Sequence, residues 1–257
     1  MLFNVENLAF NYHEHVVLKD VSFSLKDGES IALLGRNGSG KTTLLKLLLG
    51  FLKPNGGKIE IDGRNLDSIS YKERAQLIAY IPQYSEMAFP TTVLDCVVMG
   101  RAPQISTFSR PKKEDYDKAI ESIELMGIKH LMNKSMAKIS GGEKQLAIIA
   151  RALTQESRVL LLDEPTSALD YSNQLLVLES AEKLRQNGYT ILFSTHNPEQ
   201  AFHLSTSVLI LDDGHSEYYP DKEKLKDGKR LSMLYGRDLY LSEIDTGSNR
   251  RIICVPK

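Results

Sequence analysis

A glycine-rich segment near residue 40 has the residue types and the spacing that bind a phosphate chain. The pattern G-x-x-x-x-G-K-[ST] is met at every fixed position by residues 35–42 (GRNGSGKT). Its glycines let the backbone curl so that successive N–H groups point at an anion, and a helix beginning near Lys41 adds its positive end. Lys41 can then reach the β- and γ-phosphates, while the Thr42 hydroxyl can bind Mg²⁺. The apolar stretch before this loop, residues 30–34, supplies the strand that such a loop follows.

A second candidate lies at the acidic end of another short apolar strand, residues 159–164 (VLLLDE). In P-loop nucleotidases an aspartate at such a strand end helps to hold Mg²⁺, and Asp163 fits that role. Glu164, one residue further on, is placed to polarise a water for attack on the γ-phosphate. Many buried strands end in a solvated carboxylate, so this assignment depends on the phosphate loop in the same chain.

A third motif, residues 140–145 (SGGEKQ), precedes an apolar stripe at helical spacing. Ser140 and Glu143 form a capping box, and the two glycines between them expose amides at a helix N-terminus. Taken alone, the motif is typical of a well-capped helix and nothing more. In this order and spacing it predicts a second anion site, and it resembles the signature motif of ABC-type ATPases.

The resemblance to ABC-type ATPases extends from about Leu2 to Leu211. It identifies Tyr12 with the aromatic residue that stacks on adenine, and Gln83 with the Q-loop glutamine. Residues 167–170 (SALD) resemble the D-loop, and His196 resembles the switch histidine. Each of these residues alone would be typical of packing or of a solvated surface.

The resemblance implies ATP and Mg²⁺ as ligands, together with defined sets of site residues. The expected catalytic residues are Glu164, His196 and Gln83. The residues expected to bind ATP are Tyr12, Gly35, Asn37, Gly38, Ser39, Gly40, Lys41, Thr42 and Thr43. Those expected to bind the metal are Thr42, Gln83 and Asp163. Those expected to contact ATP held by a second subunit are Ser140, Gly141, Gly142, Glu143 and Asp170.

Four positions depart from the commoner pattern of the family. Glu143 stands where Gln is frequent, and Asn197 follows His196 where Asp is usual. Ser205 and Thr206 stand where an Ala-Asp or similar acidic pair is common. The last three changes leave open how the surroundings of the switch histidine are arranged.

The periodicity of apolar residues predicts an α/β fold. Together with the resemblance, it indicates a P-loop NTPase core, with a mostly parallel sheet and an N-terminal antiparallel β part, plus a helical subdomain. Strands are predicted at residues 2–10, 21–25, 30–34, 58–61, 159–162, 190–193 and 208–211, and helices at 41–49 and 172–186. Stripes from Tyr116 to Met126 and from Leu146 to Leu153 predict helices in an insert, and residues 239–244 and 250–255 predict a hairpin turning at 245–248.

Four parts are expected along the chain. Residues 1–84 form the N-terminal part of the ATPase core, and residues 85–156 form the helical subdomain with the signature motif. Residues 157–216 complete the core, and residues 217–257 form a C-terminal tail with the hairpin. The stretch from Gln83 to about Arg110 joins core and insert, and the resemblance implies that it borders a groove for a membrane subunit. Charge reversal at Arg101 is therefore expected to spare the basal hydrolysis of the isolated subunit.

Composition excludes several other classes of protein. The 257 residues are 42 % hydrophobic and 25 % charged, typical of a globular protein with a sizeable core. A net charge of −1 argues against a strongly basic nucleic-acid binder, and two cysteines are too few for a disulfide framework. No apolar run approaches the roughly 20 residues of a membrane span, and the first eleven residues do not resemble a secretory signal. The composition predicts a soluble, cytoplasmic protein.

The resemblance implies a separate ATPase subunit with three kinds of partner. It pairs head to tail with a second copy, binds two membrane-spanning permease subunits, and serves a substrate-binding protein indirectly; no nucleic acid is expected. Residues 92–103 (TVLDCVVMGRAP), 169–174 (LDYSNQ) and 234–236 (LYG) resemble the ATPases of metal-chelate importers. That group handles iron-siderophore, haem, cobalamin and molybdate-type substrates.

We therefore predict a subunit that binds and hydrolyses ATP to power an importer of a metal chelate or related oxyanion. It would lie at the cytoplasmic face of the inner or plasma membrane, held there through the permease. Two alternatives stay open: the ATPase of an exporter, and a soluble ABC ATPase without a transport role, such as an iron–sulfur assembly factor.

Overall fold

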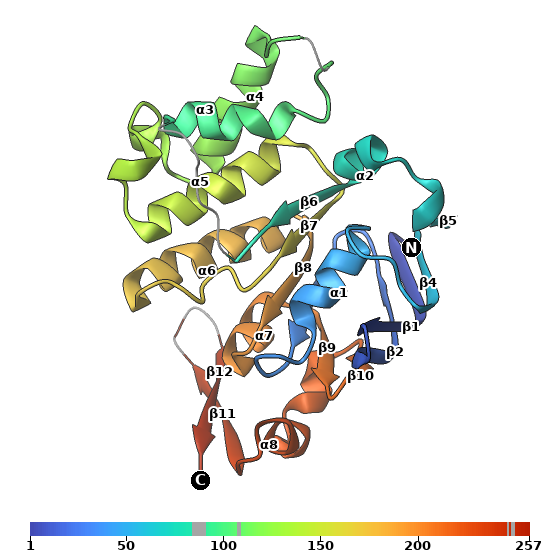
Figure 1. Ribbon diagram of the computed structural model, residues 1–257. Helices are drawn as coiled ribbons and strands as arrows, with labels where there is room; N and C mark the ends of the chain where they lie inside the picture. The colour runs from blue at the N-terminus through green and yellow to red at the C-terminus, as the bar shows by residue number, and fades with distance from the viewer. Residues whose placement is uncertain (84–90, 107–108, 246, 248–249) are drawn as a thin grey trace. The chain divides into compact units, whose positions relative to one another are not determined.

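The computed structural model describes residues 1–83, 91–106, 109–245, 247 and 250–257 (Figure 1). The chain divides into two compact units, each described by itself below. The first unit comprises Met1–Ile69 and Arg185–Lys257, and the second comprises Ser70–Leu184. The expected start of the helical subdomain at residue 85, and Thr246 and Ser248 of the expected hairpin turn, lie outside the described residues.

An antiparallel sheet forms the N-terminal part of the first unit. Its strands run in the order β2-β1-β4-β5. The bounds are β1 (Phe3–Tyr12), β2 (His15–Leu25), β4 (Gly56–Ile61) and β5 (Arg64–Asn65), followed by the 3₁₀ turn η1 (Leu66–Ser68). Val5 pairs with Phe23 on one side and with Ile59 on the other, and all three side chains are buried. Alternation along these strands therefore gives the sheet one apolar face, as the sequence pattern predicts.

A second group of strands in the same unit positions the phosphate loop. Its order is β10-β9-β3-β8, with β3 parallel to both β9 and β8 and with β10 antiparallel to β9. The bounds are β3 (Ser30–Leu34), β8 (Thr190–Thr195), β9 (Ser207–Asp212) and β10 (His215–Tyr219). Every residue of β3 and β8 is buried, which is typical of parallel strands covered on both faces.

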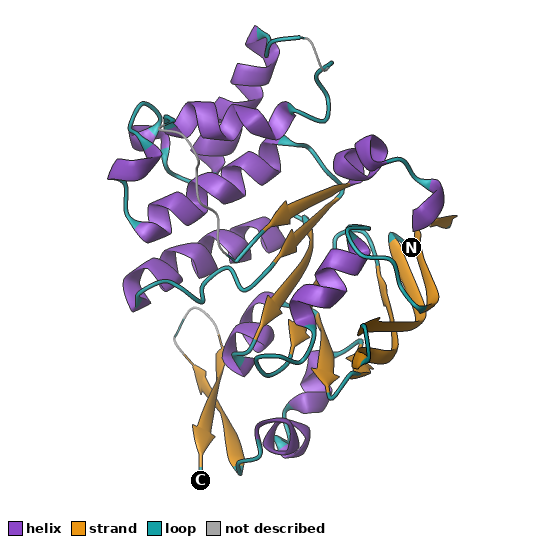
Figure 2. Cartoon of the chain, in the orientation of Figure 1, coloured by secondary structure: helices purple, strands orange, loops and turns teal. Residues whose placement is uncertain are grey.

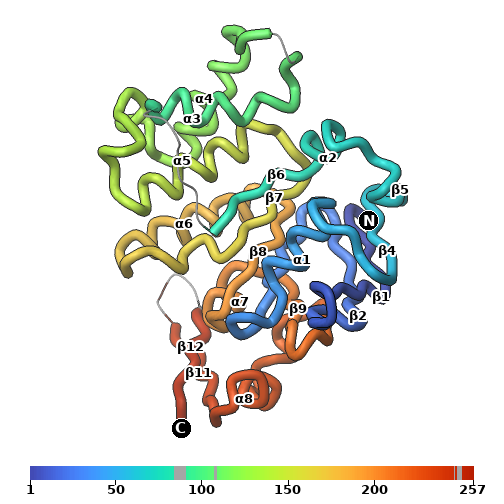
Figure 3. Tube along the Cα trace, viewed as in Figure 1, coloured from blue at the N-terminus to red at the C-terminus, as the bar shows by residue number. Residues whose placement is uncertain are grey.

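The remaining elements of the first unit are helices and a terminal hairpin. They are α1 (Lys41–Leu48), α7 (Pro198–Leu204), the 3₁₀ turn η5 (Lys222–Leu225), α8 (Lys229–Tyr235), β11 (Leu239–Asp245) and β12 (Arg250–Pro256). Leu44, Leu45, Leu47 and Leu48 of α1 are fully buried, so this helix is anchored by its apolar side chains. Strands β11 and β12 pair in antiparallel, which confirms the predicted hairpin, and β12 packs against α7 (Figure 3).

The second unit is mostly helical (Figure 2). Its elements are α2 (Tyr71–Leu77), β6 (Ile78–Ile81), α3 (Val93–Val98), η2 (Met99–Arg101), α4 (Lys113–Leu125), η3 (Lys129–Leu131), η4 (Met136–Lys138), α5 (Gly141–Thr154), β7 (Val159–Leu162) and α6 (Tyr171–Gln186). Helices α3, α4 and α5 pack on one another, and β6 pairs with β7 in parallel. The predicted apolar stripes face this helical core: Ala119 and Ile123 of α4 are fully buried, as is Ile149 of α5.

Several short elements were not predicted from the sequence, for a common physical reason. Helix α2 buries none of its residues, so it has no apolar stripe; Ser70 caps it by accepting the N–H of Glu73. Strand β6 has only four residues, and α8 has seven. Such short segments carry too few turns or alternations for periodicity to identify them.

The part of the chain that the structure describes contains no helix long and apolar enough to cross a membrane. This agrees with the absence of a long apolar run in the sequence.

Arg101 holds together three parts of the second unit. Its side chain is 13 % exposed, and Nε donates to Asp115 Oδ1 at 3.1 Å. Its Nη1 donates to the carbonyl of Thr154 at 3.0 Å and to Glu156 Oε2 at 2.7 Å. Hydrogen bonds from the Lys112 N–H and from Arg101 hold the pKa of Asp115 below its usual value. These contacts give Arg101 a structural role in the second unit, while the expectation that its charge reversal spares basal hydrolysis stays a prediction.

Arg101→Glu is expected to lower the free energy of unfolding by about 3 kcal/mol, because it places a carboxylate against Asp115 and Glu156. Urea unfolding of the full chain measures this effect. Lys113→Glu is the matched control: the Lys113 side chain is 90 % exposed, and its reversal should cost less than about 1 kcal/mol. Equal stability of the two variants would contradict the structural role of Arg101.

Candidate functional site

The phosphate loop begins directly after β3 in the first unit. The N–H of Gly35 donates to the carbonyl of Thr195 at 3.3 Å, and the N–H of Ser39 donates to the carbonyl of Arg36 at 3.2 Å. The loop then passes into α1 at Lys41. The Lys41 ammonium donates to the carbonyls of Gly35 and Arg36 at 2.9 and 3.0 Å. The buried lysine is therefore held against its own loop, with its charge beside the amides that would surround an anion.

The glycines of this loop are required by space and by backbone conformation. A Cβ on Gly35 would lie 2.6 Å from the carbonyl oxygen of Leu211, a backbone atom that cannot move aside easily. Gly40 has φ +99° and would bring a Cβ to 2.9 Å from Val17 Cγ1. Gly38 has φ +82° with open space around it, so its requirement is conformational alone. The three glycines of the loop are thus required for separate physical reasons.

Ser39 gives an independent indication that the loop fits a phosphate. Its Oγ is buried and has no hydrogen-bond partner among the residues that the structure describes. A buried hydroxyl without a partner costs about 1–3 kcal/mol, so an oxyanion accepting from it would recover that energy. The other expected ligands lie alongside: Asn37 is exposed, Thr42 is half-buried, and Thr43 is buried in α1.

His196 follows the C-terminal end of β8, the strand beside β3. Leu34 pairs with Thr195, so the loop and His196 begin at the carboxyl ends of neighbouring parallel strands. The phosphate loop and the segment that starts at His196 therefore begin side by side within one unit. His196 is exposed, and its carbonyl accepts the hydroxyl proton of Tyr235 at 2.7 Å. Tyr235 was not identified from the sequence as a neighbour of this site.

The two departures from the family pattern near His196 have local explanations. Asn197 caps α7, because its side-chain oxygen accepts the N–H groups of Glu199 and Gln200 at 2.8 and 3.4 Å. An asparagine serves as an N-cap as well as an aspartate does. Thr206 is bound to β3, since its Oγ1 donates to the carbonyl of Ser30 at 3.0 Å. An acidic side chain at this place would lose that donor.

Tyr12 is the last residue of β1. Its ring lies edge-on to Phe10, with the ring centroids 4.8 Å apart and the planes at 87°. The side chain is 42 % exposed, so part of the ring is available to a ligand. The assignment of Tyr12 to adenine stays a prediction.

In the second unit, the candidate metal ligands follow two parallel strands. Ile81 pairs with Leu162, and the N–H of Asp163 donates to the carbonyl of Ile81 at 2.9 Å. Asp163 is 2 % exposed, and its Oδ2 accepts the hydroxyl of Tyr80 at 3.3 Å. Burial, and then the charge of Asp163, raise the pKa of Tyr80, so this hydroxyl stays protonated and donates. Tyr80 was missed from the sequence, although it stands three residues before Gln83.

Glu164 and Gln83 are connected through Ser167. Glu164 has φ +43°, a left-handed conformation that a non-glycine residue adopts at some cost. Its carbonyl accepts both the N–H and the hydroxyl of Ser167 at 3.1 Å. Gln83 Nε2 donates to Ser167 Oγ at 3.0 Å. The predicted base, Glu164, and the predicted Q-loop glutamine, Gln83, are therefore both hydrogen-bonded to Ser167.

The signature motif lies against the first turn of α6. Ser140 Oγ accepts the N–H of Glu143 at 3.2 Å, and Glu143 accepts the N–H of Ser140 at 2.7 Å, which confirms the predicted capping box. That N–H is the largest of the causes that lower the pKa of Glu143. A Cβ on Gly142 would lie 2.2 Å from Asn173 Oδ1. Asn173 in turn donates through N and Nδ2 to the two oxygens of Asp170, at 2.9 and 3.0 Å.

The structure thus brings most of the predicted site residues together within their own units. In the first unit, residues 35–43 lie beside the start of the His196 loop. In the second unit, Gln83, Asp163 and Glu164 form one group, and Ser140 to Glu143 with Asp170 form another. The oxygen donors among the expected metal ligands, a hydroxyl, a carboxylate and an amide, are of the kind that Mg²⁺ binds. Their function stays a prediction.

A family profile and two relatives of known name all relate this chain to the ATP-binding proteins of ABC transporters. The profile of the family described as ABC transporter matches residues 18–167. The molybdate import ATP-binding protein MolC of Haemophilus influenzae is 38 % identical over 92 % of this chain and 85 % of its own length. The ferric enterobactin transport ATP-binding protein FepC of Escherichia coli is 32 % identical over 90 % of this chain and 86 % of its own.

A solved structure is similar over the whole chain. It shows an inward-facing ABC transporter assigned to the metal-chelate type, with a TM-score of 0.88 and 34 % identity. The match covers 100 % of this chain and 97 % of that one.

Ser39→Ala separates a ligand role of this hydroxyl from a structural one. Removing a buried hydroxyl without a partner should raise the stability of the nucleotide-free chain by about 1 kcal/mol, and should weaken ATP binding about fivefold. Thermal unfolding without nucleotide and calorimetric titration with ATP measure the two effects. Lower stability together with unchanged affinity would contradict the phosphate assignment of Ser39.

Proposed function

The chain belongs to the ABC transporter family of ATP-binding proteins, and we propose that it powers an importer of a metal chelate or a related oxyanion. As a member of that family it binds and hydrolyses ATP. The observation that supports the importer class is the similarity over its full length to a transporter assigned to the metal-chelate type. The relatives named for ferric enterobactin transport and for molybdate import agree with this class of substrate.

Hydrolysis is assigned to the residues of the phosphate loop and of the two strand ends. Lys41 and the amides of residues 35–42 hold the phosphate chain, and Ser39 Oγ donates to it. Thr42, Asp163 and Gln83 would hold Mg²⁺, which neutralises phosphate charge when bound. Glu164 accepts a proton from the water that attacks the γ-phosphorus, and the bond to the β–γ bridging oxygen breaks to leave ADP and phosphate. His196 supports the charge that develops on the γ-phosphate.

A second copy of the chain is part of the proposal. Ser140 and Gly141 are exposed at the N-terminus of α5, where the helix dipole attracts an anion. In a head-to-tail dimer they would contact ATP held by the phosphate loop of the partner subunit. Asp170, at the start of α6, would belong to the same contact.

Two membrane-spanning permease subunits complete the proposed assembly. ATP is available in the cytoplasm, so the chain would work at the cytoplasmic face of the membrane, held there by the permease. A substrate-binding protein would deliver the substrate and choose between a metal chelate and an oxyanion. The ATPase would then affect transport rate rather than substrate choice.

Glu164→Gln tests the chemical assignment. The amide is nearly isosteric with the carboxylate but cannot take a proton, so kcat should fall at least about 100-fold while ATP affinity changes less than about threefold. The ATP-bound dimer should accumulate and elute earlier in size-exclusion chromatography. Lys41→Ala is the contrasting variant, because it should weaken binding and turnover together. Hydrolysis by Glu164→Gln at a rate near wild type would show that the base is another residue.

Reconstitution tests the transport assignment. The chain, combined with a permease that it co-purifies with and a candidate binding protein, should drive ATP-dependent uptake of either a ferric chelate or molybdate in proteoliposomes. Glu164→Gln in the same vesicles is the control and should abolish uptake. ATP-dependent efflux would indicate an exporter, and ATPase activity without any permease association would indicate a soluble ABC ATPase.

A further inference from the structure

In the second unit, the first turn of α5 lies directly against the start of α6. A Cβ on Gly142 would lie 2.2 Å from Asn173 Oδ1 and 2.7 Å from Asn173 Cβ. A Cβ on Gly141 would lie 3.3 Å from Leu169 Cδ2. Gly142 is helical and has no positive φ. Its close approach to Asn173, rather than its backbone conformation, therefore requires glycine at this position.

Asn173 also binds the carboxylate of Asp170, the residue before α6. Its N–H donates to Asp170 Oδ1 at 2.9 Å, and its Nδ2 donates to Asp170 Oδ2 at 3.0 Å. The first of these bonds caps α6, because the side chain of the residue before a helix accepts the N–H three positions further on. The amide side chain of Asn173 therefore touches α5 through Oδ1 and holds Asp170 through Nδ2.

The main chain of residues 169–170 is held by the next residue of α6. The N–H of Gln174 donates to the carbonyl of Asp170 at 2.8 Å, and Gln174 Nε2 donates to the carbonyl of Leu169 at 2.9 Å. Leu169 is the residue that lies against Gly141. The end of the predicted D-loop is thus bound to the first turn of α6 through its backbone as well as through its carboxylate.

Exposure separates the residues assigned to the partner's nucleotide from the residues that join them. Ser140, Gly141 and Asp170 are exposed, whereas Gly142 is buried and Asn173 is half-buried. The contact between Gly142 and Asn173 is therefore a joint that connects two exposed groups. The size of the Asn173 side chain determines how far apart these groups lie.

The hydrogen bonds of Asn173 also have an electrostatic consequence. The N-terminus of α5 attracts anions, and the Asp170 carboxylate, one side chain away, is itself an anion. Two neutral donors hold this carboxylate at the start of α6. The end of α5 therefore stays available to a phosphate group.

We propose that Asn173 is a positioning residue for the nucleotide held by the partner subunit. Its side chain keeps the Asp170 carboxylate and the first turn of α5 at a fixed distance, so that both reach that nucleotide together. The inference rests on the proposed head-to-tail dimer. Asn173 acts through Asp170 and through α5, and it needs no contact of its own with the nucleotide.

Asn173→Ala removes the contact with α5 and the Nδ2 donor. Glu164→Gln is the parent chain for the test, because it is expected to keep ATP-bound dimers together. In that chain, Asn173→Ala should raise the dissociation constant of the ATP-bound dimer about tenfold and change the affinity for ADP less than about twofold. ADP lacks the γ-phosphate that the partner would contact. Analytical ultracentrifugation and calorimetric titration measure the two quantities.

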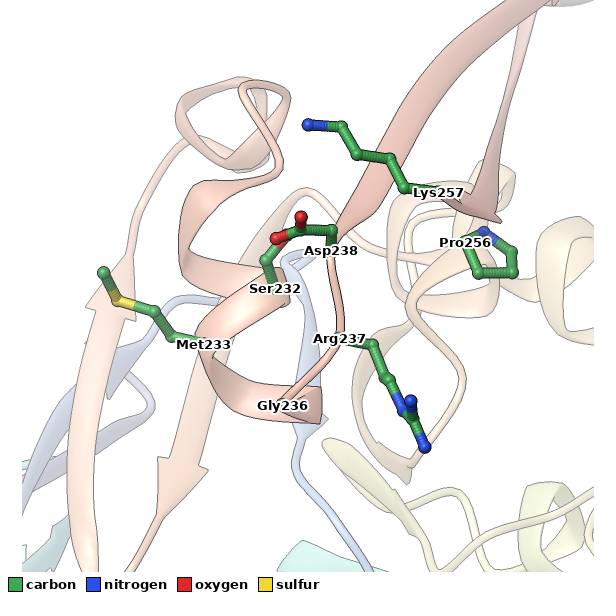
Figure 4. Close-up of a pocket in the computed structure, with 7 residues that line it drawn as sticks. All are labelled: Ser232, Met233, Gly236, Arg237, Asp238, Pro256 and Lys257. Carbon is green, nitrogen blue, oxygen red and sulfur yellow. The ribbon is translucent and has the colours of Figure 1, made fainter.

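Two control variants should leave the dimer unchanged. Glu179→Ala alters an exposed residue of the same helix, about two turns beyond Asn173. Met233→Lys alters an exposed apolar surface of the first unit: Met233 is 75 % exposed, at the pocket lined by the end of α8 and the end of β12 (Figure 4). A weaker dimer in Met233→Lys, with an unchanged dimer in Asn173→Ala, would assign the interface to this pocket and overturn the inference.

Mixed dimers of the same parent chain separate a role toward the partner from a general structural role. Lys41→Ala in one subunit disables its phosphate loop and leaves the loop of the other subunit intact. Asn173→Ala in the Lys41→Ala subunit should speed the release of ATP from the intact loop about tenfold, because that loop receives Ser140 and Asp170 from this subunit. Asn173→Ala in the other subunit should leave the release rate unchanged. Equal effects of the two placements would overturn the inference.

A pair of variants tests the joint itself. Gly142→Ala introduces a Cβ where Asn173 lies, and it should weaken the dimer at least as much as Asn173→Ala does. Asn173→Gly removes the atoms that this Cβ would meet. The double variant should therefore dimerise as tightly as Asn173→Gly alone. Additive losses would show that the two residues act separately, and would contradict the joint.

Failure of the proposed function has a different signature. If Glu164→Gln forms no ATP-bound dimer, the proposed dimer fails and the positioning role fails with it. If Glu164→Gln forms the dimer and Asn173→Ala forms it equally tightly, the positioning role alone fails.

Discussion

The hydrogen bonds from the Lys41 ammonium to the carbonyls of Gly35 and Arg36 are the interaction on which the site depends. They close the phosphate loop into a ring around the ammonium group. The ring is possible only because Gly35 can approach the Leu211 carbonyl and Gly40 can approach Val17, where any Cβ would be too close. A buried positive charge is thus satisfied by main-chain oxygens of its own loop, and an arriving phosphate chain finds both the charge and the amides in place.

Other predicted site residues are also held by contacts with nearby side chains. Gln83 is held by Ser167, Asp163 by Tyr80, and Gly142 lies against Asn173, which binds Asp170. In each of these contacts the partner of the predicted site residue is a hydroxyl or an amide side chain. The ion pairs of Arg101, by contrast, join helical segments.

The sequence predicts those parts of the structure that a local pattern specifies. Strand β3, the phosphate loop, the capping box at Ser140 and the terminal hairpin all follow from spacing within a few residues. It does not predict α2, β6 or α8, which are too short to show a period, nor the positive φ of Glu164. The contacts of Arg101 could not be predicted because its partners, Asp115 and Glu156, lie 14 and 55 positions away. Contacts between residues far apart in the chain depend on packing, which no single motif encodes.

Two residues that depart from the family pattern, Asn197 and Thr206, each make a hydrogen bond that explains the residue type at that position. Asn197 keeps the capping function of the usual aspartate, so the start of α7 is unchanged even though one charge is absent. Thr206 binds the backbone of Ser30 with a donor that a carboxylate lacks, so the strand beside the phosphate loop is fixed by a neutral bond. Both substitutions remove negative charge from the segment that carries His196. The main chain at His196 is held by a neutral donor as well, because the hydroxyl of Tyr235 donates to its carbonyl.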